Sequence, residues 1–222
     1  MLYSLEANED QYLEIVDGYD VERPEGVHAV DLYSQAFGAL QQGLSETDAD
    51  LLGVIYEELG QGSEAFGQHF TPHDVCDTMA EMIVDIDETR DQPYLIADPT
   101  SGSGRLLVHV SKHLPPEKEA IYYGQDKDPS CAKMTALNLC FFNLDGYAEY
   151  GNSLTMDQYR VWQTESSIFG GAIRELDQEE FPAISFDTVP ESKPHDSDTM
   201  VNLRDWDEEF EFDESDDTGT EK

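Results

Sequence analysis

A glycine-rich turn near the middle of the chain combines residue types suited to binding a charged small molecule. Residues 98–104 read Asp-Pro-Thr-Ser-Gly-Ser-Gly, after the apolar segment Tyr94–Ala97 and before the helical pattern of Leu106–Leu114. Gly102 and Gly104 allow the backbone to approach a ligand where a Cβ would intrude, and a helix that begins there presents free N–H groups. The turn is therefore predicted to bind a ligand at the end of a strand.

Two common nucleotide-binding motifs do not fit this turn. A nucleotide-triphosphate loop continues with Gly-Lys-Ser/Thr, whereas Gly104 is followed by Arg105 and Leu106. A dinucleotide fingerprint has a third glycine where this chain has Leu107. Asp98, at the tip of the strand, would repel a pyrophosphate but suits the positively charged methionine end of S-adenosyl-L-methionine. The predicted cofactor is therefore S-adenosylmethionine.

Polar residues also follow the next two predicted strands. The strand Ile121–Gly124 is followed by Asp126, 28 residues after Asp98. A carboxylate there can accept both ribose hydroxyls of an adenosine. The predicted strand Ala148–Leu154 contains Asn152, where a polar side chain can meet the edge of an adenine ring. Each residue by itself also fits a helix cap, a turn or a loop, so it is their order and spacing that indicate a cofactor site.

The elements around these residues alternate between strand and helix. The three predicted strands are Tyr94–Ala97, Ile121–Gly124 and Ala148–Leu154. Helical patterns separate them, at Leu106–Leu114 and in the segment that Asp128 caps, with Pro129 at the first helical position. This alternation implies an α/β fold with a parallel sheet. After residue 154 the pattern weakens: Tyr159–Gln163 and Ile184–Asp187 are candidate strands, with room for a helix between them.

Two amphipathic helices are predicted upstream of the first strand. One begins near Asp48 and stops at Gly60. Its apolar face consists of Leu51, Leu52, Ile55, Tyr56 and Leu59. The other has Thr71 as its N-cap and Pro72 at its first position. The residues of this helix that are expected to face the core are Val75, Met79, Met82, Ile83 and Ile86. Residues 1–40 are expected to contain a short helix or strand, of a type that the pattern does not decide.

The chain is unusually acidic. Its 222 residues include 12 Lys+Arg and 49 Asp+Glu, a formal net charge of −37. Residues 187–222 hold 14 acidic and 3 basic residues, which leaves −26 for residues 1–186. An acidic surface spread this evenly is typical of adaptation to high salt, where the screening length falls to about 3 Å near 1 M. The alternative is an acidic protein that imitates nucleic acid or binds a basic partner.

Cysteine and histidine usage argues against a disulfide framework and a metal site. Cys76, Cys131 and Cys140 are an odd number within apolar segments, so we expect free buried thiols in a reducing cytoplasm. His69, His73 and Cys76 have a metal-like spacing, but a helix start interrupts them and no fourth ligand follows at a recognisable interval. No apolar run is long enough for a membrane span, and the N-terminus does not read as a secretion signal.

Residues 50–126 resemble the modification (methyltransferase) subunits of type I restriction systems and their adenine-N6 DNA methylase relatives. The matching motifs are Asp50-Leu-Leu-Gly-Val-Ile-Tyr-Glu57, Gly67-Gln-His-Phe-Thr-Pro72, Asp98-Pro-Thr-Ser-Gly-Ser-Gly104, Gly124-Gln-Asp126 and Gly151-Asn-Ser-Leu154. The resemblance covers about residues 45–155. It implies a Rossmann-like class I methyltransferase fold that binds S-adenosylmethionine and acts on DNA. The cofactor-binding residues it implies, with those argued above, are Phe70, Thr71, Pro72, Asp98, Pro99, Gly102, Gly104, Asp126 and Asn152.

The catalytic motif of that family is not found in this chain. The family places Asn/Asp-Pro-Pro-Tyr/Phe at the end of the fourth strand, where it holds the amine of a flipped adenine and stacks on the base. The single Pro-Pro here, Pro115-Pro116, precedes the second strand, and the expected position reads Gln158-Tyr-Arg-Val-Trp-Gln-Thr164. Tyr159 and Trp162 are candidates for stacking, although core positions are the favoured interpretation. No catalytic residue is therefore identified, and the sheet is expected to be incomplete unless another chain completes it.

Three functional hypotheses follow. The first is a DNA adenine-N6 methyltransferase of a restriction-modification or viral/host DNA-modification system, with a partner subunit that completes it or gives it specificity. The second is a catalytically inactive cofactor-binding module with a regulatory or assembly role. The third is an acidic decoy of a restriction-modification complex. The predicted organisation is an N-terminal extension (1–44), a methyltransferase-like domain (45–189) and an acidic, disordered tail (190–222).

Overall fold

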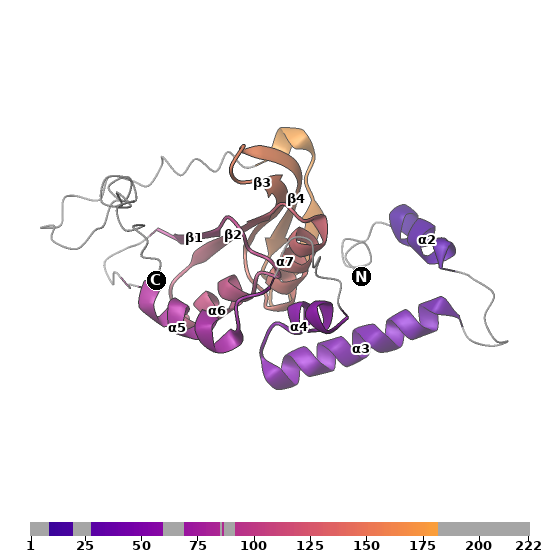
Figure 1. The fold of residues 1–222 in the computed structure, drawn as a ribbon, viewed down its shortest axis with the longest axis horizontal. Coiled ribbons are helices and arrows are strands. Elements are labelled where there is room, and N and C mark those ends of the chain that lie inside the picture. The colour runs from indigo at the N-terminus through magenta and orange to yellow at the C-terminus, as the bar shows by residue number, and fades with distance from the viewer. Residues whose placement is uncertain (1–8, 20–27, 60–68, 85, 87–91, 182–222) are drawn as a thin grey trace, which may run out of the picture. The chain divides into compact units, whose positions relative to one another are not determined.

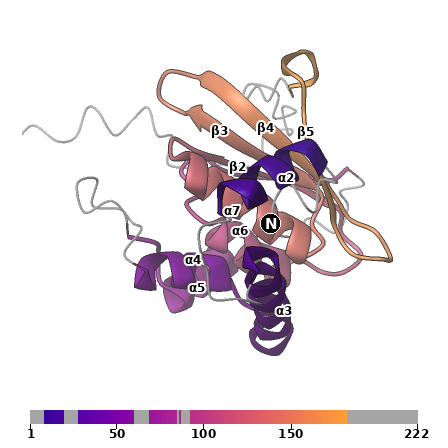
Figure 2. The same cartoon turned by 90° about the vertical axis from the view of Figure 1, so that its right-hand side faces the viewer.

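The computed structural model describes residues 9–19, 28–59, 69–84, 86 and 92–181. These residues form a five-stranded sheet in the order β1-β2-β3-β4-β5, with α4 to α7 on one side of it (Figures 1 and 2). The strands are β1 (Tyr94–Asp98), β2 (Ala120–Asp126), β3 (Gly146–Asn152), β4 (Asp157–Glu165) and β5 (Ala172–Glu175). The predicted α/β class of the fold is confirmed. The predicted tail, 190–222, lies outside the described residues.

The direction of the first three strands agrees with the prediction, and the two later strands, for which no direction was predicted, run antiparallel to their neighbours. β1, β2 and β3 are parallel, whereas β4 and β5 pair antiparallel. Only four residues, 153–156, join β3 to β4, and a parallel crossover needs a dozen or more. β5 and a 3₁₀ turn, η2 (Gln178–Glu180), occupy the segment in which a helix was considered. The candidate strand Ile184–Asp187 lies outside the described residues.

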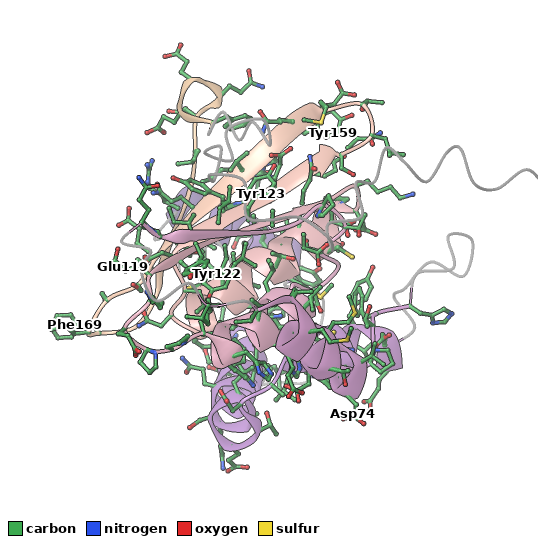
Figure 3. The ribbon with its side chains drawn as sticks, turned by 90° about the vertical axis from the view of Figure 1, so that its left-hand side faces the viewer. Asp74, Glu119, Tyr122, Tyr123, Tyr159 and Phe169 are labelled. Atoms are coloured by element: carbon green, nitrogen blue, oxygen red, sulfur yellow. The ribbon has the colours of Figure 1, made fainter. Side chains whose placement is uncertain are left out.

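The core lies between the sheet and helices α6 (Arg105–His113) and α7 (Pro129–Phe141). As predicted, Asp128 caps α7: its carboxylate accepts from the Ser130 N–H at 2.7 Å, and Pro129 begins the helix. α7 is buried on nearly all sides because it packs against β2 to β5 and also against α4 and α6. The main apolar cluster contains Ala132, Ala136, Leu137, Cys140, Ala148, Trp162 and Ile173. Figure 3 shows Tyr122 on the helix side of β2 and Tyr123 on the opposite side.

The helix before β1, α5 (His73–Ile83), differs from its prediction in two respects. Its N-cap is Pro72 and not Thr71, and no side chain caps it. The buried residues are Cys76 and Ala80, because these short side chains let α5 lie close against α6. Four of the five residues expected in the core are exposed instead: Val75 by 45%, Met79 by 39%, Met82 by 80% and Ile83 by 57%. The fifth, Ile86, is half-buried and lies beyond the end of α5.

The N-terminal part is helical: α2 (Glu9–Gly18), α3 (Ala29–Thr47) and α4 (Leu51–Glu58). α3 contacts the rest of the fold through Phe37, whose ring centroid is 6.1 Å from that of Phe141. The predicted apolar face of α4 is only partly buried, since Ile55 is 44% and Leu59 66% exposed. The three cysteines are buried and free, as predicted. Among the described helices, none is long and apolar enough to cross a membrane.

Candidate functional site

A cavity of ≈ 470 Å³ opens at the carboxyl ends of the parallel strands. The register pairs Asp98 with Gly124 and Asp126 with Tyr150, so the polar ends of the three strands share one edge of the sheet. The residues that line the cavity are His69, Phe70, Thr71, Pro99, Thr100, Gly102, Asp126, Lys127, Cys131, Asn152, Ser153 and Leu154. This edge is where open α/β sheets bind their ligands.

Six of the nine predicted cofactor-binding residues line this cavity, and the other three lie next to it. The six are Phe70, Thr71, Pro99, Gly102, Asp126 and Asn152. Pro72 caps α5 directly after Thr71, and Gly104 occupies the N-cap position of α6. Asp98 forms the tip of β1, and its Oδ1 accepts from the Thr100 N–H at 3.0 Å. Burial raises the pKa of Asp98, an effect that this N–H opposes.

The two glycines of the turn are needed for packing as well as for backbone conformation. Gly102 has φ +57° and Gly104 has φ +81°, both in the left-handed region that favours glycine. A Cβ on Gly102 would lie 2.9 Å from the Phe70 ring, and one on Gly104 would lie 3.1 Å from the Thr135 Cα. The turn is thus pressed between the Phe70 segment and α7. The space left by the missing Cβ atoms of Gly102 and Gly104 is occupied by the Phe70 ring and by Thr135.

Asp126 joins β2 to the turn. Its Oδ2 accepts from the Gly102 N–H at 2.9 Å, and its Oδ1 accepts from the Asp128 N–H at 2.8 Å. Each carboxylate oxygen keeps a further lone pair for a ligand hydroxyl. Burial raises the pKa of Asp126, while the two backbone N–H groups lower it. The arrangement can present a fixed acceptor pair to a diol.

The Phe70–Thr71 segment is positioned by α4 and by Arg105. The Phe70 ring stacks on Tyr56 with centroids 5.8 Å apart, and the Phe70 N–H donates to Glu57 Oε1 at 3.0 Å. Arg105 Nη1 donates to the Thr71 carbonyl at 2.9 Å. Two residues of the α4 motif therefore hold one wall of the cavity.

A fully buried carboxylate, Asp50, connects these parts. As N-cap of α4 it accepts from the Gly53 N–H at 2.8 Å, and its other oxygen accepts from Ser103 Oγ at 2.6 Å and from Arg105 Nε at 3.0 Å. Asn138 of α7 also donates to it, at 2.8 Å. Sequence reasoning missed this role, although an Asp before an apolar helix is a recognisable N-cap signal.

A second buried carboxylate, Glu149 on β3, was also not predicted. It accepts from the Tyr123 hydroxyl, from Gln125 Nε2 at 2.6 Å and from Gln158 Nε2 at 2.7 Å. Burial, with the adjoining carboxylate, raises the pKa of Tyr123 and keeps the phenol protonated. Because Gln158 lies on β4, this network ties the antiparallel hairpin to the parallel strands.

The two aromatic residues considered for base stacking have different surroundings. Trp162 is fully buried in the main apolar cluster, as the favoured interpretation predicted. Tyr159 is 47% exposed, its ring centroid 4.9 Å from that of Tyr150 (Figure 3). Trp162 therefore has no surface to offer a base, and Tyr159 is outside the residues that line the cavity.

The histidines considered for metal binding make other contacts. His69 lines the cavity, whereas His73 Nδ1 lies 3.1 Å from His109 Nε2. The Cys76 thiol donates to the Thr71 carbonyl at 3.6 Å, and burial raises its pKa. Within the part of the chain that the structure describes, no group of three His, Cys, Asp or Glu side chains is placed to hold a metal ion.

Comparison with known proteins decides the family. Residues 47–178, which include every described part of the cavity, match the family model described as N-6 DNA Methylase. The chain belongs to the N-6 DNA methylase family. The elements named above are thus those of a member of this family, with the turn of residues 98–104 at the carboxyl end of its first strand.

Two curated relatives of the chain are methylase subunits of type I restriction enzymes. The MpnII methylase subunit of Mycoplasma pneumoniae is 32% identical over 108 residues, and the MjaIX methylase subunit of Methanocaldococcus jannaschii is 26% identical over 159 residues. The matches cover 46% and 68% of this chain, but only 19% and 27% of the respective relatives. No solved structure matches the chain.

Replacing Asp50 by Asn tests the buried ion pair. The Arg105 side chain is 5% exposed, so the variant leaves a buried guanidinium with Glu57 at 3.5 Å as its remaining carboxylate, and we expect a loss of about 3 kcal/mol in the free energy of unfolding. Asp48→Asn is the matched control, because Asp48 pairs with Lys112 at 3.2 Å but its side chain is 75% exposed. That variant is expected to change stability by about 0.5 kcal/mol or less. Urea unfolding measures both, and equal losses would contradict the assignment.

Proposed function

We propose that this N-6 DNA methylase chain is the S-adenosylmethionine-binding half of a DNA adenine-N6 methyltransferase. The observation that carries the proposal is the single cavity shared by Phe70, Gly102, Asp126 and Asn152. Its volume of ≈ 470 Å³ falls within the range of small-molecule sites. In this proposal the Asp126 carboxylate accepts the ribose hydroxyls, Asn152 contacts the adenine edge, and Phe70 packs against the cofactor.

In this proposal the residues of the chain determine how the cofactor is oriented in the cavity. Asp98 lies next to the cavity at the tip of β1, and in this proposal its carboxylate attracts the sulfonium and ammonium groups of the methyl donor. Pro99 and Thr71 exclude water on either side, since both line the cavity. When bound, S-adenosylmethionine supplies an electrophilic methyl group, and the chain holds that group at the open side of the sheet.

We further propose that the methylated substrate is adenine in DNA, within a restriction-modification or viral/host DNA-modification system, and that a partner subunit takes part. The printed names of both relatives, type I restriction enzyme methylase subunits, support this. The residues that would hold the adenine amine are proposed to come from that partner, because the residues that line the cavity do not form an Asn/Asp-Pro-Pro-Tyr/Phe motif.

A second candidate is a cofactor-binding module that does not catalyse methyl transfer and serves regulation or assembly. The burial of Trp162 favours it, since this removes an aromatic residue that was available for base stacking. The acidic-decoy hypothesis has the charge of −37 in its favour, but it gives no reason for the cavity.

Calorimetric titration with S-adenosylmethionine tests cofactor binding, which the first two candidate functions share. The wild-type chain, in about 1 M KCl, is expected to give saturable heat, and Asp126→Asn is expected to weaken binding by about tenfold to a hundredfold, since it removes a charged acceptor. Asp74→Ala is the control, because Asp74 is exposed in the first turn of α5 (Figure 3). Absence of heat from the wild type would exclude cofactor binding.

The same samples separate the two candidates. Transfer of tritiated methyl groups to adenine-rich DNA is expected to be undetectable for the chain alone, and to appear when a motif-bearing partner is added. Transfer by the chain alone would show that it contains a complete active site. No transfer with such a partner, despite normal cofactor binding, would favour the module without catalytic activity.

The affinity for S-adenosylmethionine is expected to depend on pH through Asp126. Burial raises its pKa, so protonation begins at a higher pH than for an ordinary aspartate. Because only the ionised carboxylate is a full acceptor for two hydroxyls, the dissociation constant should rise as the pH falls toward this raised pKa. Asp126→Asn should show a shallower dependence, the remainder arising from Asp98, whose pKa is also raised. Identical pH profiles would contradict the role of Asp126.

We also propose that the protein works in the cytoplasm at high salt. With 49 Asp+Glu and 12 Lys+Arg, most carboxylates have no basic residue to pair with, so their repulsion must be screened. The melting temperature of the wild-type chain is expected to rise when KCl is increased from about 0.1 M to about 1 M. A melting temperature that stays constant or falls would argue for an acidic surface with another purpose.

A further inference from the structure

Two histidines meet where α5 and α6 pack against each other. His73 is the first residue of α5, and its Nδ1 lies 3.1 Å from Nε2 of His109 on α6. His109 is 8% exposed, and its Nδ1 lies 3.3 Å from Oδ1 of Asp77. The same carboxylate oxygen is 2.9 Å from Nε2 of His113. The proposed function uses none of these side chains.

Hydrogen bonding limits the number of protons that the histidine pair, His73 and His109, can hold. Hydrogen bonds from His113 and His109 lower the pKa of Asp77, so this carboxylate is ionised and can only accept. The Nδ1 of His109 therefore carries a proton. His109 Nε2 and His73 Nδ1 share one further proton, and this bond is present when both rings are neutral or one is cationic. It is lost when both rings are cationic, because both facing nitrogens then carry hydrogen.

The groups around His73 oppose a positive charge on its ring. Burial lowers the pKa of His73, and Arg105 and His109 of α6 lower it further, whereas Asp50 at the start of α4 raises it. The N-terminal end of a helix, where His73 lies, also disfavours a cation. On α5 itself, Asp74 follows directly but is exposed, so water screens its charge. The neutral form of His73 is therefore favoured while His109 lies against it.

The segment that leads into His73 forms one wall of the cavity. Thr71, two residues earlier, lines the cavity, and Pro72 between them is the N-cap of α5. The Thr71 carbonyl accepts from Arg105 Nη1 at 2.9 Å. Arg105 and His109 are four residues apart on α6 and so lie on the same face of that helix. The two contacts therefore hold this segment against one helix, and a displacement of His73 also moves Thr71.

We propose that the histidine pair is a pH-sensitive switch, which holds the Thr71 wall of the cavity in place with one cationic ring or none and releases it when both rings are cationic. Two imidazolium rings at this distance repel each other, and Arg105 adds a third positive charge nearby. The first turn of α5 then separates from α6, and the cavity is deformed. The consequence for S-adenosylmethionine rests on the proposed function, whereas the switch itself does not.

The switch opens in acid. Because the pKa of His73 is lowered in the closed state, its ring takes up a proton more readily once the pair has separated. The stability of the closed state is fully present above the ordinary histidine pKa of about 6.5, and it decreases as the pH falls from there toward the lowered pKa. Asp77 does not contribute in this range, since its pKa lies below that of an ordinary aspartate.

NMR of the full chain tests the switch without cofactor. The ring nitrogens of His73 and His109 report their protonation, and the Thr71 amide reports the cavity wall. Between about pH 7.5 and about pH 5, the Thr71 resonance of the wild type should shift with the same midpoint as the second protonation of the pair. A Thr71 resonance that stays constant while His73 titrates, or a His73 ring that stays neutral at about pH 5, overturns the switch.

His73→Asn is the decisive variant. The amide of Asn can donate to His109 Nε2 as an Nδ1–H does, but it cannot gain a proton, so the pH-dependent shift of Thr71 should be lost. His113→Asn is the matched control and should keep the shift, because His113 contacts Asp77 whereas the bond to His73 belongs to His109. A shift of equal size in His73→Asn would contradict the switch.

Calorimetry with S-adenosylmethionine in about 1 M KCl measures the consequence for the cavity. From about pH 7.5 to about pH 5.5 the affinity of the wild type should fall by at least about fivefold more than that of His73→Asn, in which Asp126 still titrates. Equal falls, with normal heat at pH 7.5, overturn the action of the switch on the cavity and leave the proposed function standing. No heat at either pH, with the expected shift of Thr71, overturns the proposed function and leaves the switch standing.

Discussion

The cavity depends on the burial of Asp50 against Arg105. This carboxylate is fully buried and accepts from four donors, which belong to α4, to the start of α6 and to α7. Separating α4 from α6 would break the buried Asp50–Arg105 pair, at a cost of about 3 to 5 kcal/mol, and separating α7 would remove the hydrogen bond from Asn138. The three elements therefore move as one unit. These contacts also fix the position of the turn of residues 98–104, because Ser103 is part of the turn and Arg105 directly follows its last residue, Gly104.

The same constraint explains why small residues are found where the elements meet. A Cβ on Gly53 would lie 2.3 Å from Asp50 Oδ2 and 2.6 Å from Ser103 Oγ, so a larger residue would force the carboxylate out of its hydrogen bonds. Gly102 admits the Phe70 ring in the same way. The motif at 50–57 and the turn at 98–104, distant in sequence, are two halves of one packing arrangement. Together they place Phe70 and Asp126 in the lining of the same cavity.

Interactions between residues close in sequence made part of this structure predictable. The cap at Asp128, the glycines of the turn and the apolar strands depend on neighbours in sequence, and they located β1, β2, β3, α6 and α7. Asp50 binds Ser103 and Asn138 across 53 and 88 residues, and no local pattern encodes such a pairing. The orientation of α5 was wrong for a related reason. The periodicity of α5 identified an apolar stripe, but it did not show which element packs against the helix. α5 packs against α6 through the smaller side chains Cys76 and Ala80.

The carboxyl end of β1 is the point where a ligand and a proton act on the same group. Five residues form this strand, and the last of them, Asp98, lies beside the cavity. Burial raises the pKa of Asp98, whereas a positively charged ligand in the cavity would lower it. Any effect of such a ligand on the pKa of Asp98 must be returned equally as an effect of protonation on ligand affinity, since the two binding free energies are linked.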